Sequence, residues 1–124
     1  GQTKSDAELL EGFHAHDVFV FPNHLQSWGI APFEAMATGL PVIVSTGAGA
    51  SEILTHGENA LLIPPMEPEI LAETLKSLIR NPELYSKLSL SGRKFVENNI
   101  SWEKYAKDMF KIFTETLSEH GKTA

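Results

Sequence analysis

Three short apolar runs alternate with segments of helical periodicity along this chain. The runs cover residues 18–21, 41–45 and 60–63, and each ends at proline or in a loop of small and polar residues. Continuous apolar runs of this length are typical of parallel strands that helices cover on both faces. Strands that alternate with helices at this spacing predict an α/β fold with right-handed crossovers. We therefore expect a partial doubly wound, parallel sheet of about three strands with flanking helices, in a single domain over residues 1–124.

Apolar residues recur with helical spacing between and after these runs. Ser5 and Glu8 have the spacing of a capping box that opens the first helix, and Gly39 is placed to end the second. We expect helices over residues 5–15, 29–38, 51–55 and 68–81, a helix from Pro82 through Val96, and a last helix capped by Ser101. The last helix carries an apolar stripe, which the usual burial of such side chains assigns to the core. Its members are Trp102, Tyr105, Ala106, Met109, Phe110, Phe113 and Leu117.

The first predicted strand has only one obvious neighbour. Three strands make a small sheet, and natural proteins normally avoid an apolar strand with an open edge. We infer that part of the sheet is missing. Either the first strands lie upstream of Gly1, or the sheet is completed by self-association through its exposed edge.

Composition excludes several classes of function. The 124 residues contain no cysteine, which excludes disulfides and thiolate metal sites, and 16 acidic against 10 basic residues argue against nucleic acid as a partner. No apolar run approaches the roughly 20 residues of a membrane span, and the first residues lack the features of a signal peptide. The five histidines lack the spacing of metal ligands, so we expect neither a metal nor a cofactor. We expect a cytoplasmic chain.

Lysine and arginine are absent between Lys4 and Lys76, a segment that holds ten acidic residues. A phosphate bound by this segment would be held mainly by backbone N–H groups and helix N-termini, unless basic side chains come from elsewhere.

The segment after the first predicted strand, residues 26–34, lies where doubly wound sheets bind ligands. Gly29 permits close approach of the backbone, and the free N–H groups of residues 28–31 at the helix start would face a ligand. Glu34 could accept two hydrogen bonds from a vicinal diol such as a ribose, and Gln26 could bond to a hydroxyl. On spacing alone, helix capping and compensation of the helix macrodipole explain the same residues.

A set of short motifs extends over nearly the whole chain. They are Pro22, Trp28-Gly29-Ile30, Pro32-Phe-Glu34-Ala-Met-Ala37-Thr-Gly39-Leu-Pro41-Val-Ile-Val-Ser45, Gly47 and Gly49 with Ser51-Glu52-Ile53, Asn59-Ala-Leu-Leu-Ile-Pro64, and Ser101-Trp102. In these motifs the chain resembles the C-terminal, donor-binding half of GT-B glycosyltransferases of the family 4 type. The resemblance implies transfer of a hexose from a nucleotide-sugar donor to a saccharide or lipid acceptor, with retention of the anomeric configuration. It also implies an N-terminal acceptor domain in the same enzyme, to which the last helix crosses back.

The resemblance implies roles for individual residues. Glu34 takes the position of a glutamate that contacts the nucleotide ribose, and Gln26 takes that of a glutamate that contacts the donor sugar, which makes these two the catalytic candidates. Gln26 is a departure that keeps hydrogen-bonding capacity and removes a negative charge. The implied donor-binding residues are Trp28, Gly29, Ile30, Glu34 and Gly47. The family's basic pair that neutralises the leaving diphosphate has no counterpart here.

Three classes of function stay open. The first is half of a retaining glycosyltransferase, cytoplasmic or peripheral to the membrane as a full-length enzyme. The second is a non-catalytic nucleotide-sugar binding or interaction module, for which Gln26 is the motivating feature. The third, a related GT-B enzyme such as a sugar-nucleotide epimerase or a glucan phosphorylase, is disfavoured because no lysine suited to a pyridoxal cofactor precedes Lys76.

Overall fold

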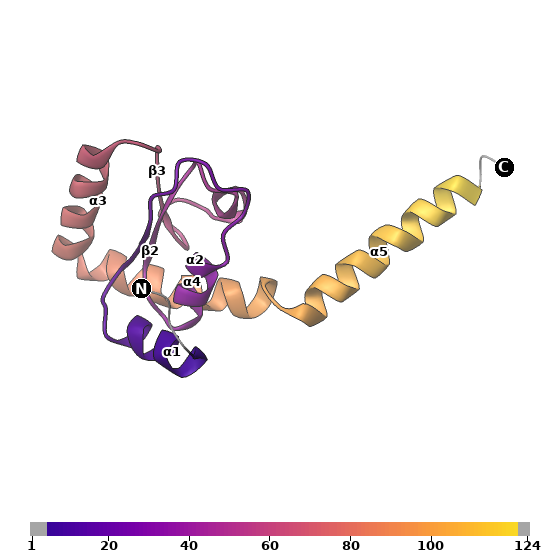
Figure 1. Cartoon of the computed structure of the whole chain (residues 1–124), viewed down its shortest axis with the longest axis horizontal. Helices are drawn as coiled ribbons and strands as arrows, with labels where there is room; N and C mark the ends of the chain where they lie inside the picture. Colours follow the sequence, from indigo (N-terminus) through magenta and orange to yellow (C-terminus); the bar gives the residue numbers. More distant parts are fainter. Residues whose placement is uncertain (1–4, 122–124) are drawn as a thin grey trace.

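The computed structural model describes residues 5–121 as an α/β fold with one small sheet (Figure 1). Every strand and helix expected from the sequence is present, and the short helix expected at 51–55 is a 3-10 helix. In chain order the elements are α1 (Asp6–His14), β1 (Phe19–Phe21), α2 (Ala31–Ala37), β2 (Val42–Ser45), η1 (Gly49–Ile53), β3 (Leu61–Ile63), α3 (Pro68–Arg80), α4 (Pro82–Asn99) and α5 (Trp102–Gly121).

The three strands are parallel and lie in the order β1-β2-β3. Phe19 pairs with Val42 in one ladder, and Ile43 pairs with Leu61 in the other. All four residues of the central strand β2 are buried, whereas the three residues of β1 are only half-buried. Among the described residues β1 pairs with β2 alone, so the prediction of a strand with a single neighbour is confirmed.

Successive residues of β2 point to opposite faces of the sheet, and each face has its own core. Val42 and Val44 belong to a core formed mainly with α1, α2 and the loop around η1, which includes Phe13, Phe33, Met36, Ala48, Leu54 and Val96. Ile43 belongs to a core on the other face, with Leu61, Ile63, Leu78 and Leu88. Because α4 contributes Leu88 to one core and Val96 to the other, it ties the two layers together.

Gly39 terminates α2, whose last helical residue is Ala37, as the sequence predicts. Gly39 has a φ of 87°, its N–H donates to the Met36 carbonyl at 2.9 Å, and the Leu40 N–H donates to the Ala35 carbonyl at 3.2 Å. These two bonds form a Schellman motif, which satisfies carbonyls at a helix end. The Ser89 hydroxyl of α4 donates to the Gly39 carbonyl at 2.6 Å and fixes the end of α2 against α4.

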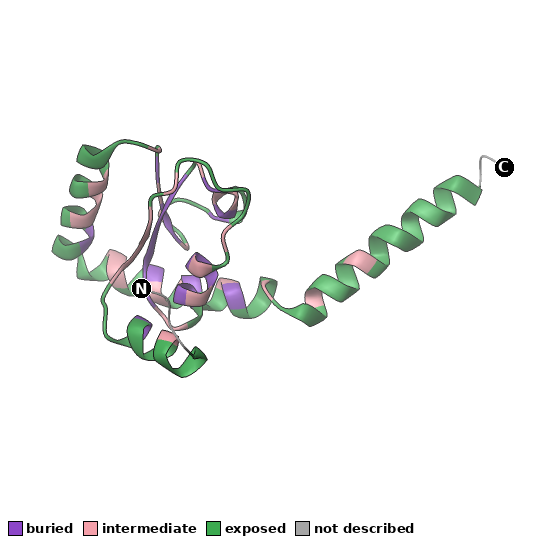
Figure 2. Cartoon of the chain, viewed as in Figure 1, coloured by how far each residue is buried: buried purple, intermediate pink, exposed green. Residues whose placement is uncertain are grey.

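The last helix, α5, contradicts one prediction. None of its described residues is buried, and the helix extends away from the rest of the fold (Figures 1 and 2). Trp102 is 85% exposed and Phe113 is 59% exposed. The prediction that the apolar stripe of α5 packs in the core is therefore wrong. Helical periodicity shows that one face of a helix favours burial, but it does not identify the surface that covers this face.

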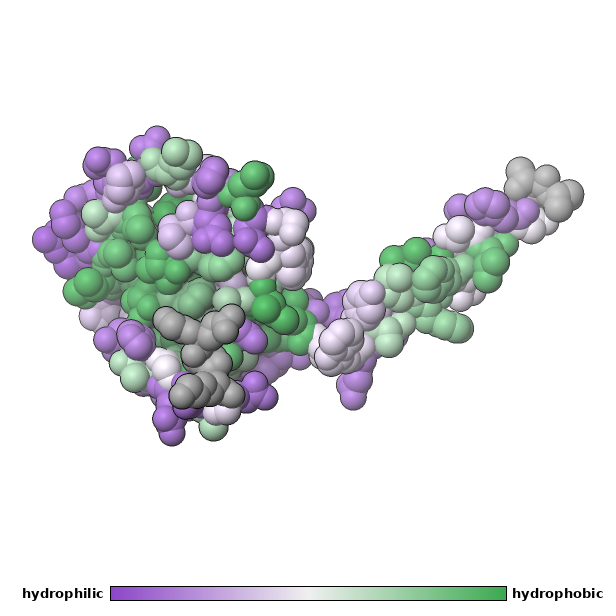
Figure 3. Space-filling model, viewed as in Figure 1, coloured by the Kyte–Doolittle hydropathy of each residue, from purple (hydrophilic) through white to green (hydrophobic). Residues whose placement is uncertain are grey.

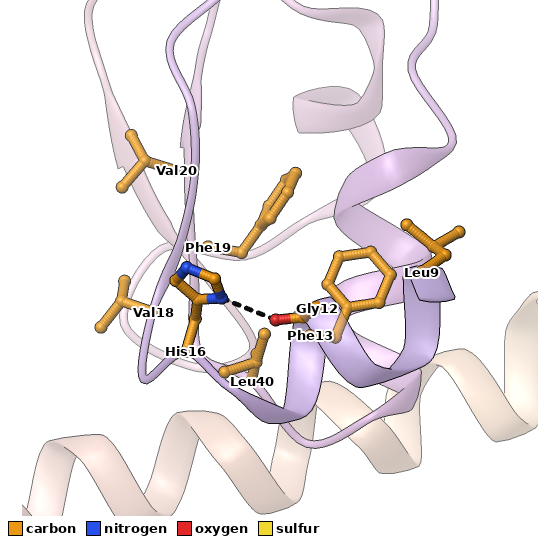
Figure 4. Close-up of a pocket in the computed structure, with 8 residues that line it drawn as sticks. All are labelled: Leu9, Gly12, Phe13, His16, Val18, Phe19, Val20 and Leu40. Carbon is orange, nitrogen blue, oxygen red and sulfur yellow. Dashed lines mark hydrogen bonds between the residues drawn. The ribbon is translucent and has the colours of Figure 1, made fainter. Parts of the chain in front are cut away.

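The free edge of β1 is bordered by an apolar hollow of about 310 Å³ (Figure 4). Leu9 and Phe13 of α1, Val18 and Val20 around β1, and Leu40 line it. Figure 3 shows apolar residues gathered at the centre of the face that the view presents. The open edge thus has apolar surface beside it, and its completion by upstream strands or by self-association stays a prediction.

None of the helices within residues 5–121 combines the length and the apolar composition that a membrane span requires.

Candidate functional site at the carboxyl edge of the sheet

The loops that follow β1 and β2 lie against each other at the carboxyl edge of the sheet. The Gln26 N–H donates to the Gly47 carbonyl at 3.2 Å, and the Gln26 carbonyl accepts from the Gly49 N–H at 2.9 Å. The Ala50 N–H donates to the Trp28 carbonyl at 3.0 Å. These bonds resume the parallel pairing of the two strands beyond their ends, through a bridge between Gln26 and Ala48. The structure thus brings Gln26 and Gly47, both predicted site residues, into direct contact.

Gly29 turns the chain from this loop into α2. Its φ is 99°, and a Cβ atom there would lie 2.7 Å from Cε1 of the Phe21 ring. Both the backbone conformation and the neighbouring ring therefore require glycine. Within residues 5–121, the N–H groups of Trp28, Gly29 and Ile30 donate to no acceptor. Three of the four N–H groups that the sequence predicts to be free at the start of α2 are therefore free.

Glu34 lies in the first turn of α2 and is half-buried. Among the described residues its carboxylate has neither a hydrogen-bond donor nor a cationic partner. Gln26 is exposed, and its side-chain oxygen accepts from Asn23 Nδ2 at 3.4 Å. Both candidate polar side chains thus retain hydrogen-bonding capacity for a ligand.

Gly47 has internal partners for both of its backbone groups. Its N–H donates to the Ser45 hydroxyl at 3.1 Å, and its carbonyl accepts from Gln26. Its predicted contact with the donor stays a prediction, whereas its contact with the loop after β1 is a feature of the fold.

A groove of about 700 Å³ separates the start of α2 from the first turns of α5, and the sequence analysis did not predict it. Trp28 and Ile30 line one side, with the Trp28 ring stacked on Phe33 at 5.6 Å between centroids. Trp102 and Tyr105 are among the residues on the α5 side. The chain contains two tryptophans, and both line this groove. They are 74 positions apart in the sequence, so no local pattern could indicate that they lie near each other.

The lysine that lines the groove does not supply a free positive charge. Lys104 Nζ lies 2.7 Å from Asp108 Oδ2, within α5. The loop after β1 contains no lysine or arginine of its own, and its free backbone N–H groups are donors without net charge. Within residues 5–121 no group of three or more histidine and acidic side chains has a geometry that could hold a metal ion.

Residues 1–95 match the family model described as "Glycosyl transferases group 1". The chain is also 30% identical over 116 residues to the capsular polysaccharide biosynthesis glycosyltransferase CapM of Staphylococcus aureus, an alignment that covers 94% of this chain and 30% of CapM. The chain belongs to the group 1 glycosyltransferase family.

Solved structures place it in the C-terminal domain of the GT-B fold, as the resemblance implied. The C-terminal domain of a group 1 family protein from Francisella tularensis has a TM-score of 0.75 and 26% identity, over 82% of this chain and 52% of that chain. Anabaena HepE, crystallised in complex with UDP-glucose, has a TM-score of 0.71 and 23% identity, over 88% of this chain and 29% of that chain, and shows a likeness of fold alone. The chain spans 24% to 30% of the length of the curated relatives that it matches.

We predict that Gly29→Ala lowers the free energy of unfolding, and Gly57→Ala measures the part of this loss that comes from the backbone conformation. Gly57 has a φ of 75° with no atom within 4 Å of an added Cβ, so Gly57→Ala reports the left-handed conformation alone, roughly 1–2 kcal/mol. Gly29→Ala adds the collision with Phe21, for which overpacking costs about 1–3 kcal/mol more. Urea denaturation of both variants measures the difference, and equal free energies of unfolding would contradict the close contact between Gly29 and Phe21.

Proposed function

We propose that this chain is the donor-binding half of a retaining glycosyltransferase, which transfers a hexose from a nucleoside diphosphate sugar. The observation that carries the proposal is the set of free N–H groups at Trp28, Gly29 and Ile30, beside the unpaired carboxylate of Glu34. Ligands of open α/β sheets bind at the carboxyl ends of the strands, which is where this set lies. Family membership supports the same class of reaction, and the UDP-glucose complex of HepE shows that a protein of this fold binds such a donor.

Each group has a distinct role in this proposal. The carboxylate of Glu34 accepts hydrogen bonds from the two ribose hydroxyls, and the N–H groups at the start of α2 donate to the diphosphate or to the donor sugar. Gln26 forms hydrogen bonds with sugar hydroxyls. In the transfer step the bond between the anomeric carbon and the diphosphate oxygen breaks, and a bond to an acceptor hydroxyl oxygen forms on the same face of the sugar. The proton of that hydroxyl passes to the departing diphosphate.

The charge of the leaving diphosphate must be neutralised by cations outside the segment that binds it. The loops after β1 and β2 contain no lysine or arginine, and Lys104 is paired with Asp108. Backbone N–H groups orient an anion, but a basic side chain adds the full positive charge that stabilises a departing diphosphate. Because the chain spans less than a third of its curated relatives, we assign these cations to the rest of the enzyme.

A second candidate function is nucleotide-sugar binding without transfer, and Gln26 is the observation that favours it. A neutral amide stabilises positive charge at the anomeric carbon less than a carboxylate does. An assay of sugar transfer, with the anomeric configuration of the product read by NMR, decides between the two candidates. Donor binding without any transfer or donor hydrolysis by the full-length enzyme would support the binding module.

Replacement of Glu34 tests the donor site. Glu34→Ala is expected to weaken the binding of UDP-glucose by about 1–3 kcal/mol, because two hydrogen bonds to ribose hydroxyls are lost. Isothermal titration calorimetry measures the affinity, and Glu83→Ala, in the first turn of α4, is a control with the same change of charge. Equal affinities for the two variants would show that Glu34 does not contact the donor.

We also infer that the N-terminal domain of the enzyme covers the apolar face of α5. The exposed side chains of this face include Trp102, Phe110, Phe113 and Leu117. A row of this kind, unpartnered along a whole helix, is typical of a protein interface. Most of the length of the curated relatives lies outside the region that this chain matches.

Amide hydrogen exchange tests this arrangement of α5. In the enzyme that includes its N-terminal domain, the amides of α5 are expected to exchange at least about tenfold more slowly than in the 124-residue chain, because docking opposes local unfolding. Phe113→Asp is expected to abolish this protection. Ser118→Asp, which makes the same change of charge about 140° around the helix from Phe113, is expected to retain it. Identical exchange of α5 in the enzyme and in the isolated chain would contradict docking.

A further inference from the structure

Two glycines flank Ala48, which lies between the turn after β2 and the start of η1. Ala48 has φ and ψ of −101° and 133°, and its side chain is buried in the core. A Cβ atom added to Gly47 or Gly49 would instead point toward the backbone of the loop after β1.

Neither glycine has room for a side chain on that side. A Cβ atom at Gly47 would collide with the His24 carbonyl oxygen and would lie 2.7 Å from the carbonyl carbon of the same residue. A Cβ atom at Gly49 would collide with the Ser27 carbonyl oxygen and would lie 3.2 Å from Trp28 Cα. All of these are backbone atoms, which cannot rotate away as a side chain can, so the loop itself would have to move.

This contact is the main support of the loop formed by residues 23–28. His24, Leu25, Gln26 and Ser27 are exposed. Beyond the ring stacking of Trp28, the described partners of the loop are one long side-chain hydrogen bond, from Asn23 to Gln26, and the three backbone bonds to residues 47–50. Those three bonds require the two loops to lie flush against each other. A displaced loop would carry Gln26 and the N–H groups of Trp28 and Gly29 with it.

We propose that Gly47 and Gly49 are positioning residues of the donor site. Because they lack a side chain, the loop after β2 packs directly against the backbone of the loop after β1. This contact holds in place the groups that bind the donor. The part of this inference that concerns the donor rests on the proposed function. The contact between the two loops does not depend on that function, because it follows from the backbone geometry alone.

The first experiment needs no ligand. In the 124-residue chain, Gly47→Ala and Gly49→Ala are expected to shift the amide NMR signals of residues 24–30 and to speed exchange of the Gln26 and Ala50 amides about tenfold or more, because the bonds that protect them lengthen. The amides of Val42–Val44, in the buried sheet, are expected to stay protected. Gly12→Ala is the matched control, since a Cβ there meets no atom within 4 Å and its φ is not in the left-handed region.

The second experiment measures the affinity for UDP-glucose in the same variants. Gly47→Ala and Gly49→Ala are expected to bind about tenfold more weakly than Gly12→Ala, the equivalent of about one net hydrogen bond. Unchanged loop signals would overturn the inference, and so would loss of protection throughout β2, which would make the glycines a requirement of the whole fold. A shifted loop with unchanged affinity would also overturn it. If the unmodified chain binds no UDP-glucose, the proposed function fails for the chain alone, and the exchange data still decide whether the glycines hold the loop.

Discussion

Burial of β2 on both faces is the constraint on which the rest of this structure depends. A strand covered on both sides needs helices above and below the sheet. Parallel pairing then requires each connection to run from the carboxyl end of one strand back to the amino end of the next. The carboxyl ends of all three strands therefore lie on the same side of the sheet, where the loops after β1 and β2 meet. The candidate site is a consequence of this topology, because Gln26, Gly29 and Gly47 belong to those two loops.

The site is built from backbone groups more than from charged side chains. The loop after β1 presents three free N–H groups, and Gly29 lets the chain turn so that they lie at the start of α2. Such groups orient an anion without carrying net charge. The arrangement agrees with the absence of lysine and arginine between Lys4 and Lys76, and with a chain that spans less than a third of its relatives. The proposed function therefore assigns the binding geometry to this chain and the charge neutralisation to the rest of the enzyme.

Local signals in the sequence predicted the elements, and nonlocal contacts explain what it did not predict. Strands were identified correctly from the apolar runs around Val42 and Leu61, and the end of α2 from Gly39, because these signals act within a few residues. The groove between Trp28 and α5 joins residues that are remote in sequence, and no local pattern encodes it. Burial of α5 was predicted wrongly because amphipathicity does not identify the surface that covers an apolar face. The roles of Gln26 and Glu34 stay predictions, since their contacts depend on a bound donor.

The most direct test of the central claim is an amide NMR titration of the 124-residue chain with UDP-glucose, with UDP as a second ligand. The account predicts saturable shifts at Trp28, Gly29 and Ile30, since their free N–H groups acquire acceptors, and at Glu34 as its carboxylate gains the ribose hydroxyls. Saturable shifts confined to residues away from the carboxyl edge of the sheet, with these four amides unchanged, would contradict the assignment of the donor site.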